Sequence, residues 1–185
     1  FIGLDFGTST SVVSLIRIGN DEKMLIESLS LDQPQENGGT TRHHLVNTVL
    51  ANIDGKFLFG RDAQRLRPFL RNGIDVFSSF KMLLGLDLGP NYPQTSLRRG
   101  EANEPIETAK DAATLFFKRL KTAITAALIR EGQPTEWAIA VTVPASFEAN
   151  QRRDLRDCLT EAGLNGFVGF IDEPNAAFLS HLFET

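Results

Sequence analysis

Residues 1–16, FIGLDFGTSTSVVSLI, decide the fold that the rest of this 185-residue chain has to complete. The stretch opens with bulky apolar side chains, as a strand buried in a sheet does, at Phe1, Ile2, Leu4 and Phe6. Gly7 interrupts this run, four hydroxyl residues follow it, and a second apolar run begins at Val12. We therefore expect a β-hairpin whose turn presents backbone N–H groups and hydroxyls, with Asp5 at the edge of the turn.

The predicted turn has the properties of a phosphate site. The glycine at position 7 lets the backbone approach a ligand closely, and consecutive N–H groups form a concavity that binds anions. The carboxylate of Asp5 repels phosphate, so it fits such a site only when a divalent cation, usually Mg²⁺ with its waters, lies between them. An ordinary hairpin with a polar tip and a solvated aspartate explains the stretch equally well, because short glycine-rich turns are weak signals.

The composition argues against several classes of protein. The formal net charge is −4 and no run of Lys and Arg is present, so neither a nucleic-acid partner nor a basic membrane-binding surface is expected. The single cysteine, Cys158, cannot form an internal disulfide and favours a reducing compartment, so we expect a cytoplasmic protein. Cys158 lies on an apolar helical stripe and is expected in the core. The three histidines lack zinc spacing, and no apolar run reaches the ~18 residues of a membrane span.

The second half of the chain alternates helices and strands. Residues 107–131 predict a long helix, capped by Thr108 with Asp111 as the reciprocal acid. A buried strand, a helix, a second strand and a last helix are expected over residues 137–143, 148–162, 167–171 and 174–182. This alternation favours an α/β sheet. Asp172 and Glu173 directly follow the last strand, at the edge where open α/β sheets bind ligands.

The first half is predicted to be richer in strands. Its expected elements are a strand over residues 23–29, a loop over 30–41, strands over 45–53 and 56–59 joined by Asp54-Gly55, helices over 61–69 and 76–85, and a loop over 87–104. Lys81 is the only charged residue of the second helix, VFSSFKMLLG. Two interpretations of Lys81 are open: a lysine whose head extends to solvent from a short helix, or a functional cation.

Three separated motifs together resemble one protein family. The sequence FIGLDFGTSTS resembles the first phosphate hairpin of the actin-like ATPase superfamily, which contains sugar kinases, actins and heat-shock chaperones. The sequences AIAVTVPASFEANQRRDLRDCLTEAGL and GFIDEPNAAFLSHL look like the DnaK-type, 70-kDa heat-shock chaperone family, and VFSSFKMLLG resembles that family's short lysine-bearing helix. The motifs follow the family's order and span nearly the whole chain.

The resemblance implies an α/β, actin-like ATPase (ribonuclease H-like) fold, of which this chain is lobe one only, with an inserted α+β subdomain. Residues 1–35 and 106–185 would form subdomain IA, with the phosphate hairpin and the core sheet. Residues 36–105 would form subdomain IB. The second lobe, with a second phosphate hairpin and the adenosine pocket, is expected after residue 185.

By the same resemblance, catalysis is expected from Asp5, Lys81 and Glu173. Asp5 would orient a hydrated Mg²⁺, and Lys81 would position the attacking water and offset charge on the γ-phosphate. Glu173 would contact the metal through water and pair with Lys81. The residues expected to hold the phosphates are Gly7, Thr8, Ser9 and Thr10.

Pro144 and Arg152 resemble the family's proline switch and the surface arginine that report the nucleotide state to the substrate-binding domain. Four positions depart from the family's pattern: Met82 stands where an arginine usually follows the lysine, Ser146 and Thr10 each replace an aromatic residue, and Arg42 replaces the proline that usually follows the paired threonines.

The implied function is the N-terminal ATPase lobe of a DnaK-type molecular chaperone of the stress response, with ATP/ADP and Mg²⁺ as cofactors. The full-length protein would be an ATP hydrolase that acts on unfolded client polypeptides through a C-terminal domain, with a J-domain co-chaperone and a nucleotide exchange factor as partners. The isolated lobe is expected to be inactive. Three alternatives stay open: an actin-like filament-forming ATPase, a sugar kinase, and a nucleotide-binding regulator that does not hydrolyse ATP.

Overall fold

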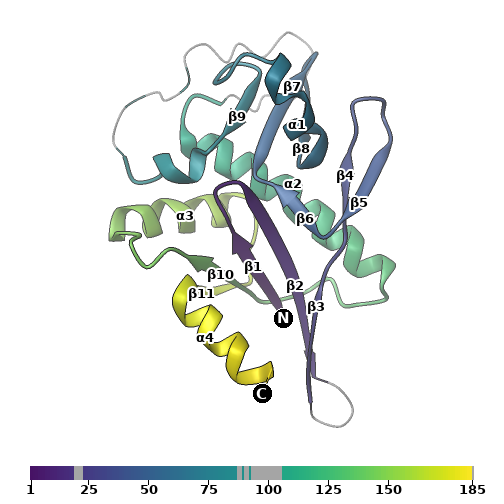
Figure 1. Ribbon diagram of the computed structural model, residues 1–185, viewed down its shortest axis with the longest axis vertical. Coiled ribbons are helices and arrows are strands. Elements are labelled where there is room, and N and C mark those ends of the chain that lie inside the picture. Colours follow the sequence, from purple (N-terminus) through teal and green to yellow (C-terminus); the bar gives the residue numbers. More distant parts are fainter. Residues whose placement is uncertain (19–22, 87–88, 90–91, 93–105, 185) are drawn as a thin grey trace.

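The computed structural model describes residues 1–18, 23–86, 89, 92 and 106–184 (Figure 1). The loop predicted over residues 87–104 therefore lies outside the described residues, apart from Gly89 and Tyr92. Among the described residues, no helix combines the length and the apolar character needed to cross a membrane.

The centre of the fold is a mixed sheet with the strand order β11-β10-β1-β2-β3, and β6 also pairs with β2. These strands are β1 (Ile2–Phe6), β2 (Thr10–Ile18), β3 (Met24–Ser28), β6 (Leu45–Asn47), β10 (Ile139–Val143) and β11 (Phe167–Asp172). β1 and β2 form the predicted antiparallel hairpin, whereas β10 runs parallel to both β1 and β11. The α/β class predicted from the alternation of elements is confirmed.

Three helices flank the sheet: α2 (Ala109–Arg130), α3 (Ala149–Glu161) and α4 (Glu173–Glu184). The predicted cap of α2 is present, since Thr108 Oγ1 accepts from Asp111 N at 3.2 Å and Asp111 Oδ2 accepts from Thr108 N at 2.8 Å. α2 passes behind the sheet and α4 lies in front of it (Figure 1).

Alternation along the strands separates a core face of the sheet from an open face. Phe6 points to the α2 side, where its ring centroid lies 6.2 Å from that of Phe116 and 4.8 Å from that of Phe117. Its neighbour Asp5 points to the other face and is exposed. The alternation of side chains along β1 therefore places the carboxylate on the open side of the sheet.

A second group of elements follows β3 in the chain. It contains β4 (Leu31–Pro34), β5 (Thr40–His43), β7 (Val49–Ile53), β8 (Lys56–Phe59), the helix α1 (Arg61–Leu66) with the 3-10 turn η1 (Arg67–Phe69), β9 (Val76–Ser78) and the 3-10 turn η2 (Phe80–Leu83). The predicted turn between β7 and β8 is confirmed, with positive φ at Asp54 (48°) and Gly55 (86°). The predicted division into subdomains, 1–35 with 106–185 and 36–105, stays a prediction.

The loop predicted over residues 30–41 is wrong, because β4 and β5 pair there as an antiparallel ribbon. Pro34 lies at the end of β4, where proline does not break a sheet, and Gly38 with its φ of 85° belongs to the turn. Asp32 and Arg42 face each other across the ribbon, with Arg42 Nε 2.8 Å from Asp32 Oδ1. This hydrogen bond holds the pKa of Asp32 below its ordinary value.

The single strand predicted over residues 45–53 is also wrong, because the chain leaves one sheet for another at Thr48. Thr48 N donates to Ser9 O at 2.9 Å, and its hydroxyl donates to Gly7 O at 2.8 Å. The break between β6 and β7 therefore ties this segment to the turn of the first hairpin.

The helix predicted over residues 76–85 is wrong as well. Val76 and Phe77 pair with β7 as strand β9, and Ser79 adopts a left-handed φ of 59° that ends the strand and opens η2. Lys81 on η2 is only 2 % exposed, so the interpretation of a lysine extending to solvent is wrong too.

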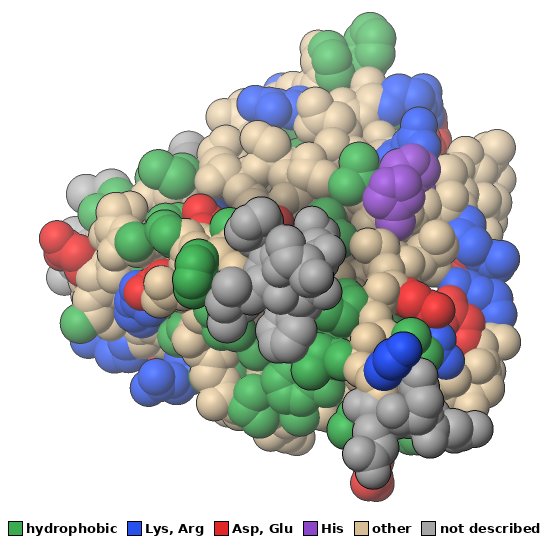
Figure 2. Space-filling model, turned by 60° about the horizontal axis from the view of Figure 1, so that its bottom comes forward, with side chains coloured by type: hydrophobic (Ala, Val, Ile, Leu, Met, Phe, Trp, Pro, Cys, Tyr) green, Lys and Arg blue, Asp and Glu red, His purple; other side chains and the backbone are tan. Residues whose placement is uncertain are grey.

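Figure 2 shows the end of the molecule that lies at the bottom of Figure 1, where apolar side chains lie between small groups of charged ones. In the described part of the chain, exposed large apolar side chains include Ile18, Val168 and Phe178. The surface in this view carries no broad field of a single charge.

Candidate functional site

An open cleft of about 770 Å³ lies where η2 meets the ends of β1 and β10 and the start of α4. Six of the residues predicted for the site line it: Asp5, Gly7, Thr8, Lys81, Pro144 and Glu173. They come from segments that are far apart in the sequence, so the fold alone brings them together (Figure 1).

Lys81 is the buried cation of the cleft. Its Nζ donates to Phe6 O at 2.5 Å and lies 3.3 Å from Glu173 Oε1, although the two residues are 92 positions apart. The same nitrogen lies 5.5 Å from the ring centroid of Phe6 and 5.4 Å from that of Phe147. Two aromatic rings, a carbonyl and a carboxylate thus hold one ammonium group in a nearly dry position.

Glu173 lies between the buried ammonium group of Lys81 and the solvent. Its side chain is 46 % exposed, whereas that of Lys81 is 2 % exposed. Glu173 is the first residue of α4 and directly follows β11, so its position is fixed by the end of a strand and the start of a helix. A carboxylate placed in this way can contact Lys81 and a water-bound ligand in the cleft at the same time.

Asp5 is held by the neighbouring parallel strand. The register pairs Asp5 with Thr142, and Thr142 Oγ1 donates to Asp5 Oδ1 at 2.7 Å. Among the described residues, Asp5 Oδ2 accepts no hydrogen bond. One carboxylate oxygen is therefore oriented by the protein, and the other is available to a ligand.

The turn of the first hairpin is tight, and its carbonyls point into the protein. A Cβ atom at Gly7 would lie 2.2 Å from Thr10 O, so no larger residue fits this backbone. The carbonyls of Gly7 and Ser9 accept from Thr48, and within the described part of the chain the N–H groups of Thr8 and Ser9 donate to no other residue. These N–H groups are thus available to an anion.

Three of the predicted residues do not line the cleft: Ser9, Thr10 and Arg152. Thr10 is the first residue of β2. Arg152 lies on α3, where Nη2 donates to Asp172 Oδ1 at 2.5 Å and Nε donates to Phe147 O at 3.0 Å. Arg152 therefore reaches the neighbours of Glu173 and Lys81 but not the cleft itself.

Several residues of the cleft were not predicted from the sequence: Ser14, Thr142, Ala176 and Ala177, and Phe147 beside Lys81. Thr142 had a signal, because it is the single hydroxyl residue in the apolar run AIAVTV. Its partner could not be named, since the register between β1 and β10 is not readable from either strand alone.

The groups of the cleft fit a hydrated cation with a phosphate, rather than a metal held by protein atoms alone. Among the described residues, no cluster of three or more His, Cys, Asp or Glu side chains could hold a metal ion. Two carboxylates at the rim, Asp5 and Glu173, match Mg²⁺, which keeps several of its waters in proteins. The tight turn at Gly7 and the N–H groups that follow it match the phosphate.

Cys158 plays no part in this cleft. It is fully buried, and burial raises the pKa of its thiol to about 12. The prediction of a core residue is confirmed, since a nucleophilic cysteine needs a lowered pKa and access to solvent.

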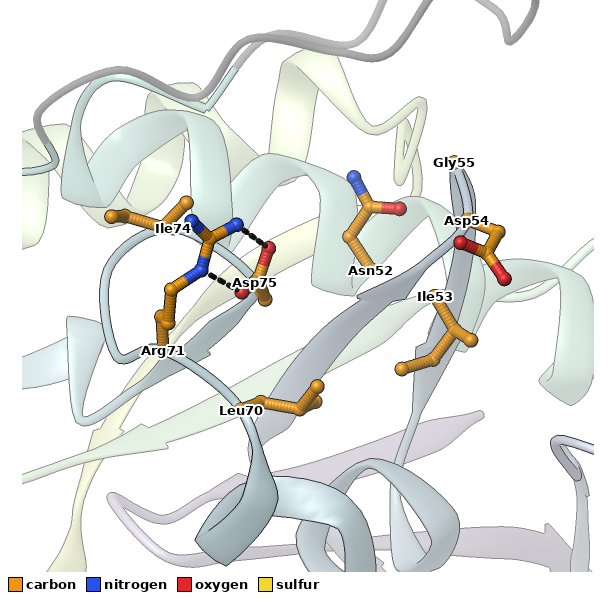
Figure 3. Close-up of a pocket in the computed structure, with 8 residues that line it drawn as sticks. All are labelled: Asn52, Ile53, Asp54, Gly55, Leu70, Arg71, Ile74 and Asp75. Atoms are coloured by element: carbon orange, nitrogen blue, oxygen red, sulfur yellow. Dashed lines mark hydrogen bonds and ion pairs between the residues drawn. The ribbon is translucent and has the colours of Figure 1, made fainter.

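Another cavity, of about 260 Å³, lies between the β7–β8 turn and residues 70–75 (Figure 3). One of its walls carries the ion pair of Arg71 and Asp75, with nitrogen–oxygen distances of 2.5 and 2.9 Å. None of the predicted site residues lines this cavity.

No family model matches this chain. The chaperone protein HscA of Edwardsiella ictaluri is 25% identical over 97% of this chain and 28% of its own length. The mitochondrial iron-sulfur cluster biogenesis chaperone of Saccharomyces cerevisiae is 29% identical over 97% of this chain and 29% of its own length.

The HscA homolog of Pseudoalteromonas atlantica is 26% identical over 100% of this chain and 28% of its own length. The chain thus spans less than a third of the length of these curated relatives, and the similarity extends over nearly all of it. These matches confirm the resemblance noted in the sequence: the chain is a distant relative of the 70-kDa heat-shock chaperone family.

Proposed function

We propose that this chain is the first lobe of the ATPase domain of a DnaK-type molecular chaperone, with the actin-like fold and with subdomains IA (1–35 and 106–185) and IB (36–105). In the full-length protein this lobe would bind and hydrolyse ATP to drive cycles of client binding. The observation that carries the proposal is the buried ammonium of Lys81, which lies 3.3 Å from Glu173 in the same cleft as Asp5 and the hairpin turn.

The proposed chemistry needs little beyond what the cleft contains, because phosphoryl transfer depends mainly on positioning and electrostatic stabilisation. Lys81 would present a positive charge that is already desolvated and already oriented by Phe6 O. The N–H groups of Thr8 and Ser9 would donate to phosphate oxygens. Asp5 and Glu173 would hold Mg²⁺ through its waters, and the bound ion would supply charge neutralisation for the phosphates.

Pro144 and Arg152 are proposed to connect this site with the rest of the chaperone. Pro144 lines the cleft directly after β10, and Arg152 contacts Asp172 and the carbonyl of Phe147. The loop between β10 and α3 begins at Pro144 in the cleft and leads into the helix that carries Arg152. A change of ligand in the cleft would therefore be transmitted to α3 along this loop.

The first experiment is a hydrolysis assay on the full-length protein. We expect Mg²⁺-dependent ATP hydrolysis that unfolded peptides stimulate, and peptide release upon ATP addition. Absence of turnover under single-turnover conditions would favour the non-hydrolysing regulator, and ATP-dependent sedimentation would favour the filament-forming ATPase.

The partners proposed for the full-length protein are unfolded polypeptides, a J-domain co-chaperone and a nucleotide exchange factor, in a cytoplasmic stress response. One matched relative is named an iron-sulfur cluster biogenesis chaperone. Proteins that assemble or receive iron–sulfur clusters are therefore the first clients to test.

A further inference from the structure

The segment that carries Lys81 is attached to α3 by two hydrogen bonds at Gly85. Gly85 N donates to Asp154 Oδ2 at 2.9 Å, and Asn150 Nδ2 donates to Gly85 O at 2.6 Å. Asn150 and Asp154 are one helical turn apart, so their side chains lie on the same face of α3. We call this pair of hydrogen bonds the Gly85 clamp.

The clamp depends on a close approach of the two backbones. Gly85 has a φ of 76°, and a Cβ atom there would lie 2.6 Å from Gln151 Cγ and 2.8 Å from Gln151 N. The first turn of α3 is itself fixed by a capping box, in which Glu148 N donates to Gln151 Oε1 at 3.0 Å. One end of the clamp is therefore part of a well-anchored helix.

The other end of the clamp needs this support. η2 has only four residues, Phe80–Leu83, and a 3-10 segment of that length has little stability of its own. Gly85 lies four residues after Lys81 and is the place where α3 holds the outgoing chain. The same helix also contacts the chain beside Glu173, because Arg152 donates to Asp172, the residue before it.

We propose that Asn150 and Asp154 are positioning residues for Lys81, which act through Gly85 and touch neither ligand nor reacting atoms. α3 then fixes the position of Lys81, since it binds the chain that directly follows η2. This inference rests on the proposed function, because it assigns a role in ATP hydrolysis.

The experiment compares three variants of the full-length protein: Asp154→Ala, Asp154→Asn and the control Asp157→Ala. Asp154 and Asp157 both pair with Lys110, at 3.7 and 3.1 Å, but of these two aspartates only Asp154 accepts a hydrogen bond from Gly85 N. The asparagine variant keeps an oxygen that accepts from Gly85 N and removes the charge. The comparison therefore separates the hydrogen bond from the ion pair.

We expect Asp154→Ala to lower the single-turnover rate ~10- to 100-fold, in the range that a misplacement of about 1 Å produces, with ATP affinity within a few-fold of the wild type. Asp154→Asn and Asp157→Ala should hydrolyse ATP at rates close to the wild type. Amide hydrogen exchange at Gly85 should be faster in Asp154→Ala than in the other two, and a cooperative thermal transition checks that each variant folds.

Three outcomes would contradict the positioning role while leaving the proposed function intact. The first is a normal rate for Asp154→Ala despite faster exchange at Gly85, and the second is an Asp154→Asn variant that is equally slow. The third is an undiminished effect of Asp154→Ala in a Lys81→Met background. A failure of the proposed function looks different, because the wild type would then lack turnover or Lys81→Met would be fully active. In that case the positioning role falls together with the function.

Discussion

Replacing Lys81 by methionine is the sharpest test of the site. Methionine fills a similar volume, so Lys81→Met removes the charge and the donor without opening a large cavity. If Lys81 acts mainly on charge that develops in the transition state, the substitution should lower kcat far more than it weakens ATP binding.

The magnitude follows from the contacts of Lys81. Loss of one preorganised electrostatic partner commonly costs ~10²–10³ in rate, or about 3–4 kcal/mol of transition-state stabilisation. The cost in folding should be smaller. Phe6 O loses its donor, which costs about 1–3 kcal/mol for a buried group. Glu173, at 46 % exposure, regains water.

The assay is single-turnover hydrolysis by the full-length protein, with nucleotide affinity from calorimetry and stability from urea unfolding. Lys56→Met serves as the matched control, because Lys56 is an exposed lysine of β8 outside the cleft. If Lys81→Met turns over at the wild-type rate while its stability falls, Lys81 is a structural lysine and the catalytic interpretation fails.

Four further predictions follow from the same geometry. Glu173→Ala should slow hydrolysis and raise the Mg²⁺ concentration needed for half-maximal rate, because the proposed role runs through the metal's waters; an unchanged Mg²⁺ titration would contradict it. Arg152→Ala should leave basal hydrolysis within a few-fold and weaken stimulation by peptide, and equal loss of both rates would refute the coupling role. Phe116→Ala should lower the free energy of unfolding by ~3–5 kcal/mol, since its ring is fully buried against four other phenylalanines of the core; a urea-unfolding change below about 1 kcal/mol would be inconsistent with that packing. The buried thiol of Cys158, whose pKa is raised from 9.0 to about 12, should stabilise the fold fully below pH 9 and lose that contribution as the pH approaches 12, so Cys158→Ala should show a flatter stability profile in this range.

The features that could be predicted from sequence are those that depend on local pattern. The hairpin needed only the apolar run, Gly7 and the second run, and the start of α2 needed only Thr108 and Asp111. The order of helices and strands after residue 106 follows from periodicity in the same way. Each of these elements is specified by residues within one turn or one strand of each other.

The features that sequence reasoning missed depend on partners far away in the chain. Val76 and Phe77 fit a helical stripe as well as a strand, and only pairing with β7 selects the strand. The loop predicted over residues 30–41 is wrong because Pro34 and Gly38, which are typical of a loop, form the end of a strand and the turn of a ribbon, and only the pairing of β4 with β5 shows this. The contacts of Thr142 with Asp5 and of Asp154 with Gly85 require a register and a packing arrangement that no single segment encodes.

The tight turn at Gly7 affects which positions can distinguish active from inactive relatives of this chain. Any side chain at this position would collide with the carbonyl of Thr10, whether or not a nucleotide ever binds. A descendant without the proposed reaction would keep the glycine for as long as it kept the hairpin. Retention of this glycine therefore says nothing about activity. Relatives without the activity are better recognised at Asp5, because its exposed carboxylate could be replaced by an amide at little cost to the stability of the fold.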